Sequence, residues 1–173
     1  MTDYTLNGVH PLRRLMWALL KSELGWTEAN YNGAVPIVTP QQQPELNAGN
    51  FPYIVYNYTQ QEISQQYWLK EEQATFVIYS GDEEDIRKAM NMLVTFFSAQ
   101  DVSANYLNWW VADHGSAAHQ KFNYKWIRVA SAIGAGPTEE EGGREDGIIT
   151  LRYQYTNDSP LTQPSNDRFR PPA

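Results

Sequence analysis

The pattern of the sequence changes at Gly81, and this change constrains the fold more than any other feature. Residues 67–80 form a run rich in aromatic and β-branched side chains that ends in Phe76-Val77-Ile78-Tyr79, which predicts a strand. Asp82 then offers a capping side chain, and the acidic residues after it favour a helix N-terminus. Apolar residues follow at helical spacing, and we expect the helix to end near Ala99: Ile86, Ala89, Met90, Leu93, Val94 and Phe97. A strand that leads into a helix with one apolar face predicts a helix packed on a sheet.

A second amphipathic helix is predicted near the N-terminus, over residues 11–24. Pro11 suits the first turn of a helix, and Gly25 suits its C-terminal cap. Its apolar residues fall on one face because they are spaced by three and four: Leu12, Leu15, Met16, Leu19 and Leu20. A shorter helix is predicted over residues 102–111, with Leu107, Trp110 and Val111 facing inward.

Four further segments complete the expected sheet and its connections. Residues 34–39 predict a short edge strand because Pro36 has no amide hydrogen to give to a ladder. Residues 53–58 predict a strand that pairs antiparallel with residues 67–80. Residues 122–133 carry large side chains on both faces, so we expect a central strand. Ile149, Leu151, Tyr153 and Tyr155 alternate with polar residues, which is typical of a half-exposed antiparallel strand.

These elements predict an α+β fold with an antiparallel or mixed sheet of four to five strands and two to three helices packed on one face. We expect a single domain over residues 1–156 and an extended, proline-rich tail over residues 157–173. Residues 134–147 hold turn residues at both ends and acidic residues between, which predicts a mobile hairpin loop. The sequence contains no internal repeat.

Charge and composition argue against several classes of function. The formal net charge of −7 opposes a grip on phosphate, since nucleic-acid affinity depends on Lys and Arg. Cysteine is absent, which removes disulfides, thiolate metal sites and Cys nucleophiles. Leu15 to Leu20 is too short to span a bilayer, and no cleavage pattern follows it. Six Trp and eleven Tyr suit a protein that assembles through surfaces partly apolar and partly wet.

The sequence offers little that resembles a reaction centre, and we expect no cofactor and no metal. Gly134-Ala135-Gly136 leads into acidic residues rather than a helix with Lys and Ser or Thr, so it does not match a phosphate loop. The nearby carboxylates lack the alternating spacing of a calcium loop, which favours a solvated charge run: Glu139, Glu140, Glu141, Glu145 and Asp146.

One cluster of residues supports an alternative hypothesis, that the protein is an enzyme. Asp113, His114 and His119 are the clustered candidates for metal or acid–base work, although a spacing of five does not align the two histidines on a helix and a third metal ligand is missing. Ser116 lies near both histidines without the glycine frame that exposes a nucleophile. Trp109-Trp110 could stack sugars or bases, but core and subunit contacts explain the pair more simply.

Between Pro11 and Thr156 the chain resembles the tail terminator, or tail completion, proteins of tailed bacteriophages. The resemblance is architectural: the helix RRLMWALLKSEL, a Pro-containing strand and loop, the strand FPYIVYNY, a strand ending in FVIYSGDEEDI, a helix, and a terminal hairpin ending in DGIITLRYQYT. Such a resemblance implies a protomer of a hexameric ring that caps the tail tube and joins it to the head connector. It implies no catalytic residue. The protein is then expected in the virion, at the tail or neck, after synthesis in the host cytoplasm.

A ring requires two complementary patches on each protomer. The candidates for these contacts are Trp109, Trp110, the loop over residues 41–50, the acidic loop with Glu139, Glu140 and Glu141, and a C-terminal anchor formed by Arg168, Phe169 and Arg170. If DNA passes through the lumen, an acidic wall lets phosphate slide without specific binding.

The sequence also allows two other hypotheses about the function. The first is another neck or baseplate component, such as a head–tail connector or a sheath-associated protein. The second is a small hydrolase that uses Asp113, His114 and His119. No membrane partner is expected.

Overall fold

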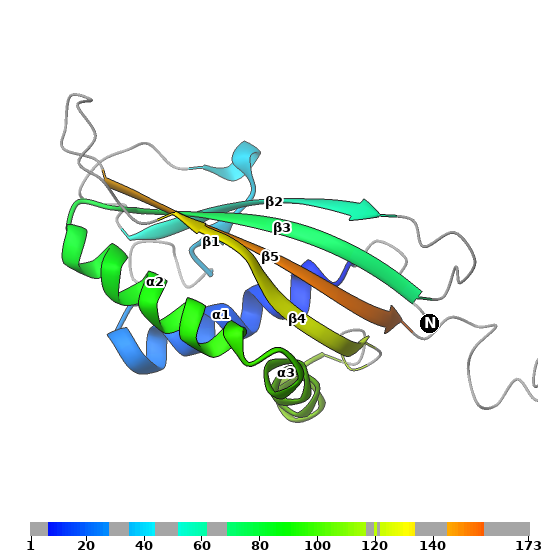
Figure 1. Cartoon of the computed structure of the whole chain (residues 1–173). Coiled ribbons are helices and arrows are strands. Elements are labelled where there is room, and N and C mark those ends of the chain that lie inside the picture. The colour runs from blue at the N-terminus through cyan, green and yellow to red at the C-terminus, as the bar shows by residue number, and fades with distance from the viewer. Residues whose placement is uncertain are drawn as a thin grey trace, which may run out of the picture.

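The computed structural model describes residues 7–27, 35–43, 52–61, 69–116, 120, 122–133 and 145–157. Within them the fold is α+β, as predicted, with three α-helices packed against a five-stranded mixed sheet (Figure 1). In chain order the elements are α1 (Val9–Leu24), β1 (Ile37–Val38), the 3₁₀ turn η2 (Pro40–Gln42), β2 (Tyr53–Gln61), β3 (Leu69–Ser80), α2 (Glu83–Ser98), α3 (Gln100–His114), β4 (Phe122–Ile133) and β5 (Glu145–Asn157).

The strands follow the order β1-β2-β3-β5-β4 across the sheet. The short strand β1 lies at one edge, parallel to β2, and its edge position confirms the reading of the Pro36 segment. The predicted antiparallel pairing of β2 with β3 is also confirmed, and β5 pairs antiparallel with both β3 and β4.

The prediction that residues 122–133 form a central strand is wrong, because β4 lies at the opposite edge of the sheet. Large side chains occur on both of its faces for a local reason. The guanidinium of Arg128 lies 4.5 Å from the ring centroid of Trp126. The Arg128 side chain therefore covers part of the indole on the outer face, and no further element has to pack there. The end of β4, over residues 130–133, is exposed.

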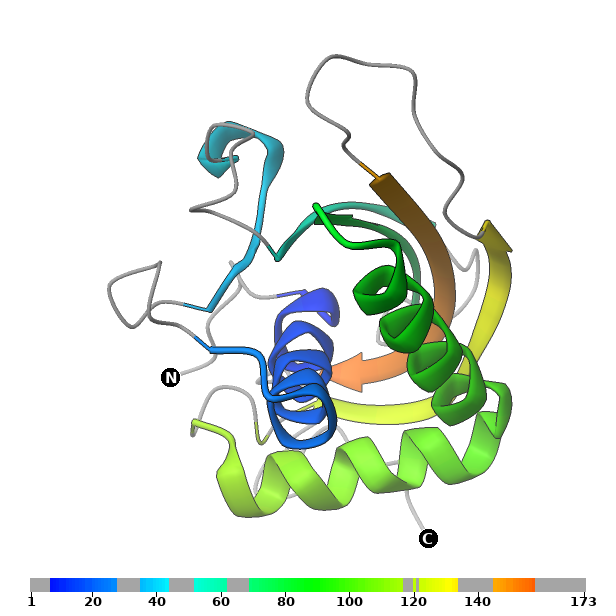
Figure 2. The same ribbon diagram turned by 90° about the vertical axis from the view of Figure 1, so that its left-hand side faces the viewer.

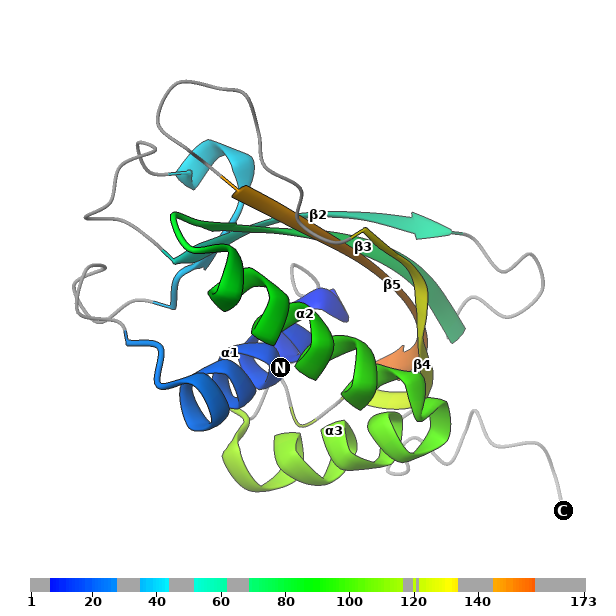
Figure 3. The same ribbon diagram turned by 60° about the vertical axis from the view of Figure 1, so that its left-hand side comes forward.

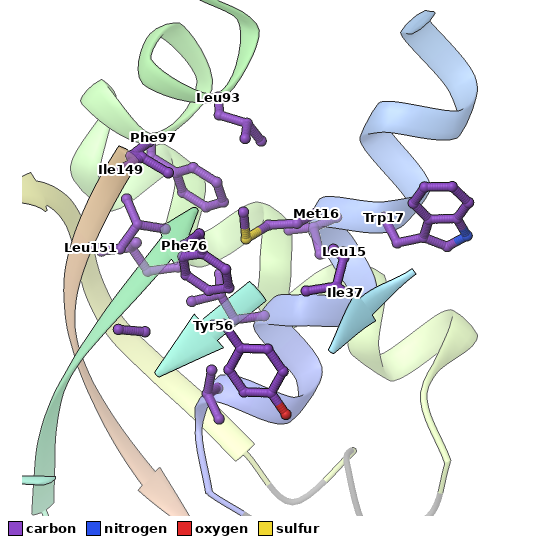
Figure 4. Packing of buried hydrophobic residues seen from close by; sticks show 14 of the residues in the cluster. Leu15, Met16, Trp17, Ile37, Tyr56, Phe76, Leu93, Phe97, Ile149 and Leu151 are labelled. Carbon is purple, nitrogen blue, oxygen red and sulfur yellow. The ribbon is translucent and has the colours of Figure 1, made fainter. Parts of the chain in front are cut away.

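The sheet curves around the helices, which all lie on its concave face (Figure 2, Figure 3). The predicted amphipathic spacing of α1 is confirmed, since Leu12, Leu15, Met16 and Leu20 are buried. Alternation along the strands sends every second side chain into the same core. Figure 4 shows how this core joins side chains of several elements: Leu15 and Met16 of α1, Leu93 and Phe97 of α2, Phe76 of β3, and Ile149 and Leu151 of β5.

Helix α2 begins where the sequence predicts. The side chain of Asp82 accepts a hydrogen bond from the backbone N–H of Glu84 at 2.9 Å, which satisfies one amide of the first turn. The helix then packs closely on β5 at Gly147. A β-carbon at that position would lie 2.7 Å from Cγ2 of Ile86 and 3.0 Å from Cγ of Met90. The absence of a side chain at Gly147 therefore sets the distance between α2 and the sheet.

Helix α3 is longer than the predicted 102–111, because it runs from Gln100 to His114. The hydroxyl of Ser103 lies within hydrogen-bond distance of the backbone oxygens of Phe96 and Ala99, and its single proton can be donated to either of them. This buried polar group connects α2 to α3 at the corner between them. Leu107 and Val111 are buried as predicted, whereas Trp110 is half-buried.

Strand β5 starts earlier than predicted. Residues 145–147 were expected in the hairpin loop, but Glu145 and Asp146 pair with Ser80 and Tyr79 in the register of the sheet. The rest of that loop, residues 134–144, and the predicted tail after Asn157 lie outside the described residues. Among the helices of the described part of the chain, none is long and apolar enough to cross a membrane.

Candidate interaction surface on helix α3

The outward side of α3 exposes large apolar side chains where a solvent-facing helix is ordinarily polar. Val102, Tyr106 and Trp109 are 69%, 38% and 58% exposed, and their spacing of four and three places them along one line of the helix. We call these three residues the aromatic face of α3. Leu107 and Val111 on the opposite side are fully buried, so α3 is apolar on both sides.

Ring contacts hold the two aromatic side chains of this face in place. The ring centroids of Phe96 and Tyr106 are 5.4 Å apart in an edge-to-face arrangement, and those of Tyr106 and Trp109 are also 5.4 Å apart. The ring of His114 lies edge-to-face with that of Trp109, with 6.4 Å between the centroids, and it stacks on Trp110 at 5.2 Å. Rings positioned in this way lose little conformational entropy when a partner covers them.

The two adjacent tryptophans of the predicted interface face different surroundings. Trp109 is exposed on the aromatic face, whereas Trp110 is half-buried and packs against the core. Glu139, Glu140, Glu141, Arg168, Phe169 and Arg170 lie outside the described residues, so their predicted contacts remain predictions.

The enzymatic candidates are only partly placed. Nδ1 of His114 lies 3.5 Å from a carboxylate oxygen of Asp113, and both side chains are exposed at the end of α3. His114 also contacts the backbone oxygen of Trp110 through Nδ1 at 3.2 Å. His119 lies outside the described residues. Among the residues that the structure describes, no three His, Asp or Glu side chains gather in a way that could hold a metal ion.

Sequence reasoning missed a buried carboxyl group on the inner face of β3. The side chain of Glu72 is fully buried, and its Oε2 accepts a hydrogen bond from the hydroxyl of Tyr155 at 3.0 Å. Its alternation with Ala74, Phe76 and Ile78 was the signal that could have placed it inside, because strand side chains two apart share a face.

The surroundings of Glu72 oppose its ionisation. Burial raises the pKa of this carboxyl group, while the hydroxyl groups of Tyr155 and Tyr153 and the nearby backbone amides of Val9 and Gly8 partly offset the rise. Those amides belong to the start of α1, where no side chain of the helix itself provides a cap. The carboxyl group of Glu72 therefore lies near the positive end of the α1 dipole.

Two polar atoms in this cluster are incompletely bonded. Among the residues that the structure describes, Oε1 of Glu72 and the hydroxyl of Tyr153 have no hydrogen-bond partner. The hydroxyl of Tyr124 instead donates to the backbone oxygen of Gly8, which also ties α1 to the sheet. The cluster fixes α1 on the sheet.

No protein-family model matches the sequence, and no curated protein is significantly similar to it.

Proposed function

We propose that the chain is a structural virion protein of a tailed phage. It assembles as a hexameric ring that terminates the tail tube and joins it to the neck. The observation that carries the proposal is the aromatic face of α3. Val102, Tyr106 and Trp109 expose apolar area that water solvates poorly, and a partner surface would remove that area from water.

The residue types of this face suit a protein contact. Trp and Tyr are enriched among the residues that dominate binding energy in interfaces, because they bring a large rigid area together with a polar group. The ring contacts of Tyr106 with Phe96 and Trp109 position the face before a partner arrives. The proposed partners are other copies of this chain, the tail tube protein and the head–tail connector.

The acidic residues Glu139, Glu140 and Glu141 have a separate role in the proposal. A ring at the end of a tail tube surrounds the path of DNA, and carboxylates on its lumen repel phosphate and let the duplex pass. DNA is then a passing cargo and not a specific ligand. Arg168, Phe169 and Arg170 provide the proposed anchor on a neighbouring protomer.

Light scattering on the purified full chain, alone and mixed with tail tube protein from the same phage, tests the proposal. We expect a species with the mass of a closed ring in at least one of the two samples. A variant that combines Tyr106→Ser with Trp109→Ser should shift this species toward the monomer. Asn105→Ser, an exposed polar position on the same helix, is the matched control and should assemble like the wild type. A wild-type chain that stays monomeric in both samples contradicts the proposal.

A further inference from the structure

Within the described residues, both edges of the sheet are open over part of their length. At one edge β1 pairs only with Ile54 and Val55 of β2, so in the described part of the chain no strand lies beside the rest of β2. Residues 57–60 of β2 are exposed. At the other edge β4 has β5 on one side and, in the same described part, no strand on its other side.

One residue of α3 closes the first part of the β4 edge. The backbone N–H of Tyr124 donates to Oδ1 of Asn108 at 2.7 Å, and Nδ2 of Asn108 donates to the backbone oxygen of Tyr124 at 2.9 Å. Beyond this contact the edge continues to Ile133, which is 60% exposed. The available part of β4 is therefore its second half, which lies away from α3 in Figure 2.

Strand alternation identifies the backbone groups that point outward from each edge. The N–H of Ile54 donates to the backbone oxygen of Pro36, on the β1 side, at 2.9 Å. Because the direction of backbone groups alternates along a strand, the groups of Tyr56, Tyr58 and Gln60 also point to that side.

The same reasoning applies to β4. Tyr124 points outward to Asn108 and lies opposite Tyr155 of β5. Two irregularities between Tyr124 and Ser131 each insert one extra residue into β4, so simple alternation along the strand does not hold there. With these insertions counted, the backbone groups of Ile127, Val129 and Ala132 also point away from β5, as those of Tyr124 do.

The outward residues of the two edges occupy the same three rows of the sheet. Each row runs across the sheet from β2 through β3 and β5 to β4. The first row is Tyr56, Phe76, Ile149 and Ala132, and the second is Tyr58, Ala74, Leu151 and Val129. The third row is Gln60, Glu72, Tyr153 and Ile127. Three successive antiparallel pairings separate β2 from β4, so the two edge strands run in opposite directions.

From this match we infer that copies of the chain join by strand addition. The second half of β4 in one copy pairs antiparallel with residues 56–60 of β2 in the next, and the sheet continues from copy to copy. The inference rests on the proposed function and deepens it, because it adds to the aromatic face of α3 a second contact that the ring requires. Each facing pair of outward residues exchanges two backbone hydrogen bonds, as in any antiparallel ladder.

The side chains of the two edges favour this pairing. Edge strands of monomeric proteins ordinarily carry Lys, Pro or other features that block addition of a further strand. Residues 56–61 of β2, with the sequence YNYTQQ, contain no charge and no proline, and residues 127–133 of β4 contain Arg128 as their single charge. In the register that continues the rows, Tyr58 faces Val129, and aromatic–β-branched pairs stabilise antiparallel strands.

The contact is heterologous because it joins two different edges. Such contacts form closed rings when the rotation between copies closes, and open filaments when it does not. Since both edges use the same rows, each copy joins its neighbour without a shift along the strands, which favours a closed ring.

Proline substitutions on the outward side test the inference without removing a hydrogen bond of the protomer. Gln60→Pro deletes an outward N–H of β2, and Ala132→Pro deletes one of β4. Gln60→Thr and Ala132→Thr are the matched controls because they keep the N–H in a residue that favours strands. Each variant is measured by light scattering under the conditions in which the wild-type chain assembles. Equal midpoints of thermal unfolding for the proline and threonine variants show that the fold is retained.

We expect both threonine controls to assemble and each proline variant to be monomeric. An equal mixture of the two proline variants should give a dimer and nothing larger, because the intact β4 of Gln60→Pro fits the intact β2 of Ala132→Pro. Proline variants that assemble like their controls, a mixture that stays monomeric, or an effect of Ala132→Pro alone would each overturn the inference.

If the wild type forms rings that the prolines do not affect, strand addition fails while the ring survives. If the wild type never assembles, the proposed function fails as well.

Discussion

The side-chain amide of Asn108 bonds to both backbone groups of Tyr124, accepting from its N–H at 2.7 Å and donating to its C=O at 2.9 Å. A residue of an adjacent strand would offer the same donor and acceptor. Asn108 thus substitutes for a strand at the start of β4, and it connects α3 to the sheet at a point where the Tyr124 side chain is buried.

Asn108→Leu should lower the free energy of unfolding by about 1–3 kcal/mol, since it leaves the N–H and C=O of Tyr124 without partners. Urea denaturation followed by circular dichroism measures the change. Asn105→Leu, on the exposed side of the same helix, is the control and should stay within about 0.5 kcal/mol of the wild type. Equal stabilities of the two variants would show that the amide contact adds nothing.

Local patterns in the sequence were sufficient to predict most elements of this fold. The spacing of Leu12, Leu15 and Met16 predicted α1, and the acidic run after Gly81 predicted the start of α2, because each signal lies within a few residues. The length of α3 was underestimated because the helix is apolar on both sides, so helical periodicity is weak there.

Features that depend on contacts between distant residues were not predicted. The edge position of β4 follows from the pairing of β5 with both β3 and β4, which no local pattern encodes. The Arg128–Trp126 contact let an edge strand resemble a central one. Within the candidate surface, Trp109 was predicted from residue type, but its exposure and the burial of Trp110 depend on how α3 packs on β4.

Glu72 makes stability depend on pH in a defined direction. Because burial raises the pKa of Glu72 in the folded protein above its unfolded value of about 4.3, the folded state holds this proton to a higher pH than the unfolded state does. The stabilising contribution is complete below the unfolded pKa and is lost as pH rises through the folded pKa.

Glu72→Gln keeps the shape and removes the ionisation. We expect the stability of the wild type, relative to this variant, to fall as pH rises above about 4.3. Thermal or urea unfolding at a series of pH values gives the difference. Glu23→Gln removes one exposed carboxyl of α1 and controls for net charge. A difference between wild type and Glu72→Gln that stays flat with pH would contradict the assigned direction of the pKa shift.

The packing of α2 on β5 depends on the missing side chain at Gly147. Gly147→Ala should lower the free energy of unfolding by about 1–3 kcal/mol, because the new methyl group overlaps Cγ2 of Ile86 at 2.7 Å. Ile86→Ala alone creates a cavity and should cost about 2–5 kcal/mol. The double variant should lose less than the sum of the two, since the added methyl group fills part of that cavity. Additive losses in urea denaturation would place the strain of Gly147→Ala somewhere other than Ile86.

The adjacent tryptophans of α3 should respond differently to substitution because one is exposed and the other packs on the core. Trp109→Ser should leave the free energy of unfolding within about 0.5 kcal/mol, as it removes area that is 58% exposed in the protomer. Trp110→Ser should cost at least about 1 kcal/mol, because it removes apolar contacts with the core and the stacked ring of His114. Urea denaturation at a concentration where the chain is monomeric separates stability from assembly. A large loss in Trp109→Ser would mean that this residue stabilises the protomer, and the aromatic face would lose its main argument for a contact between proteins.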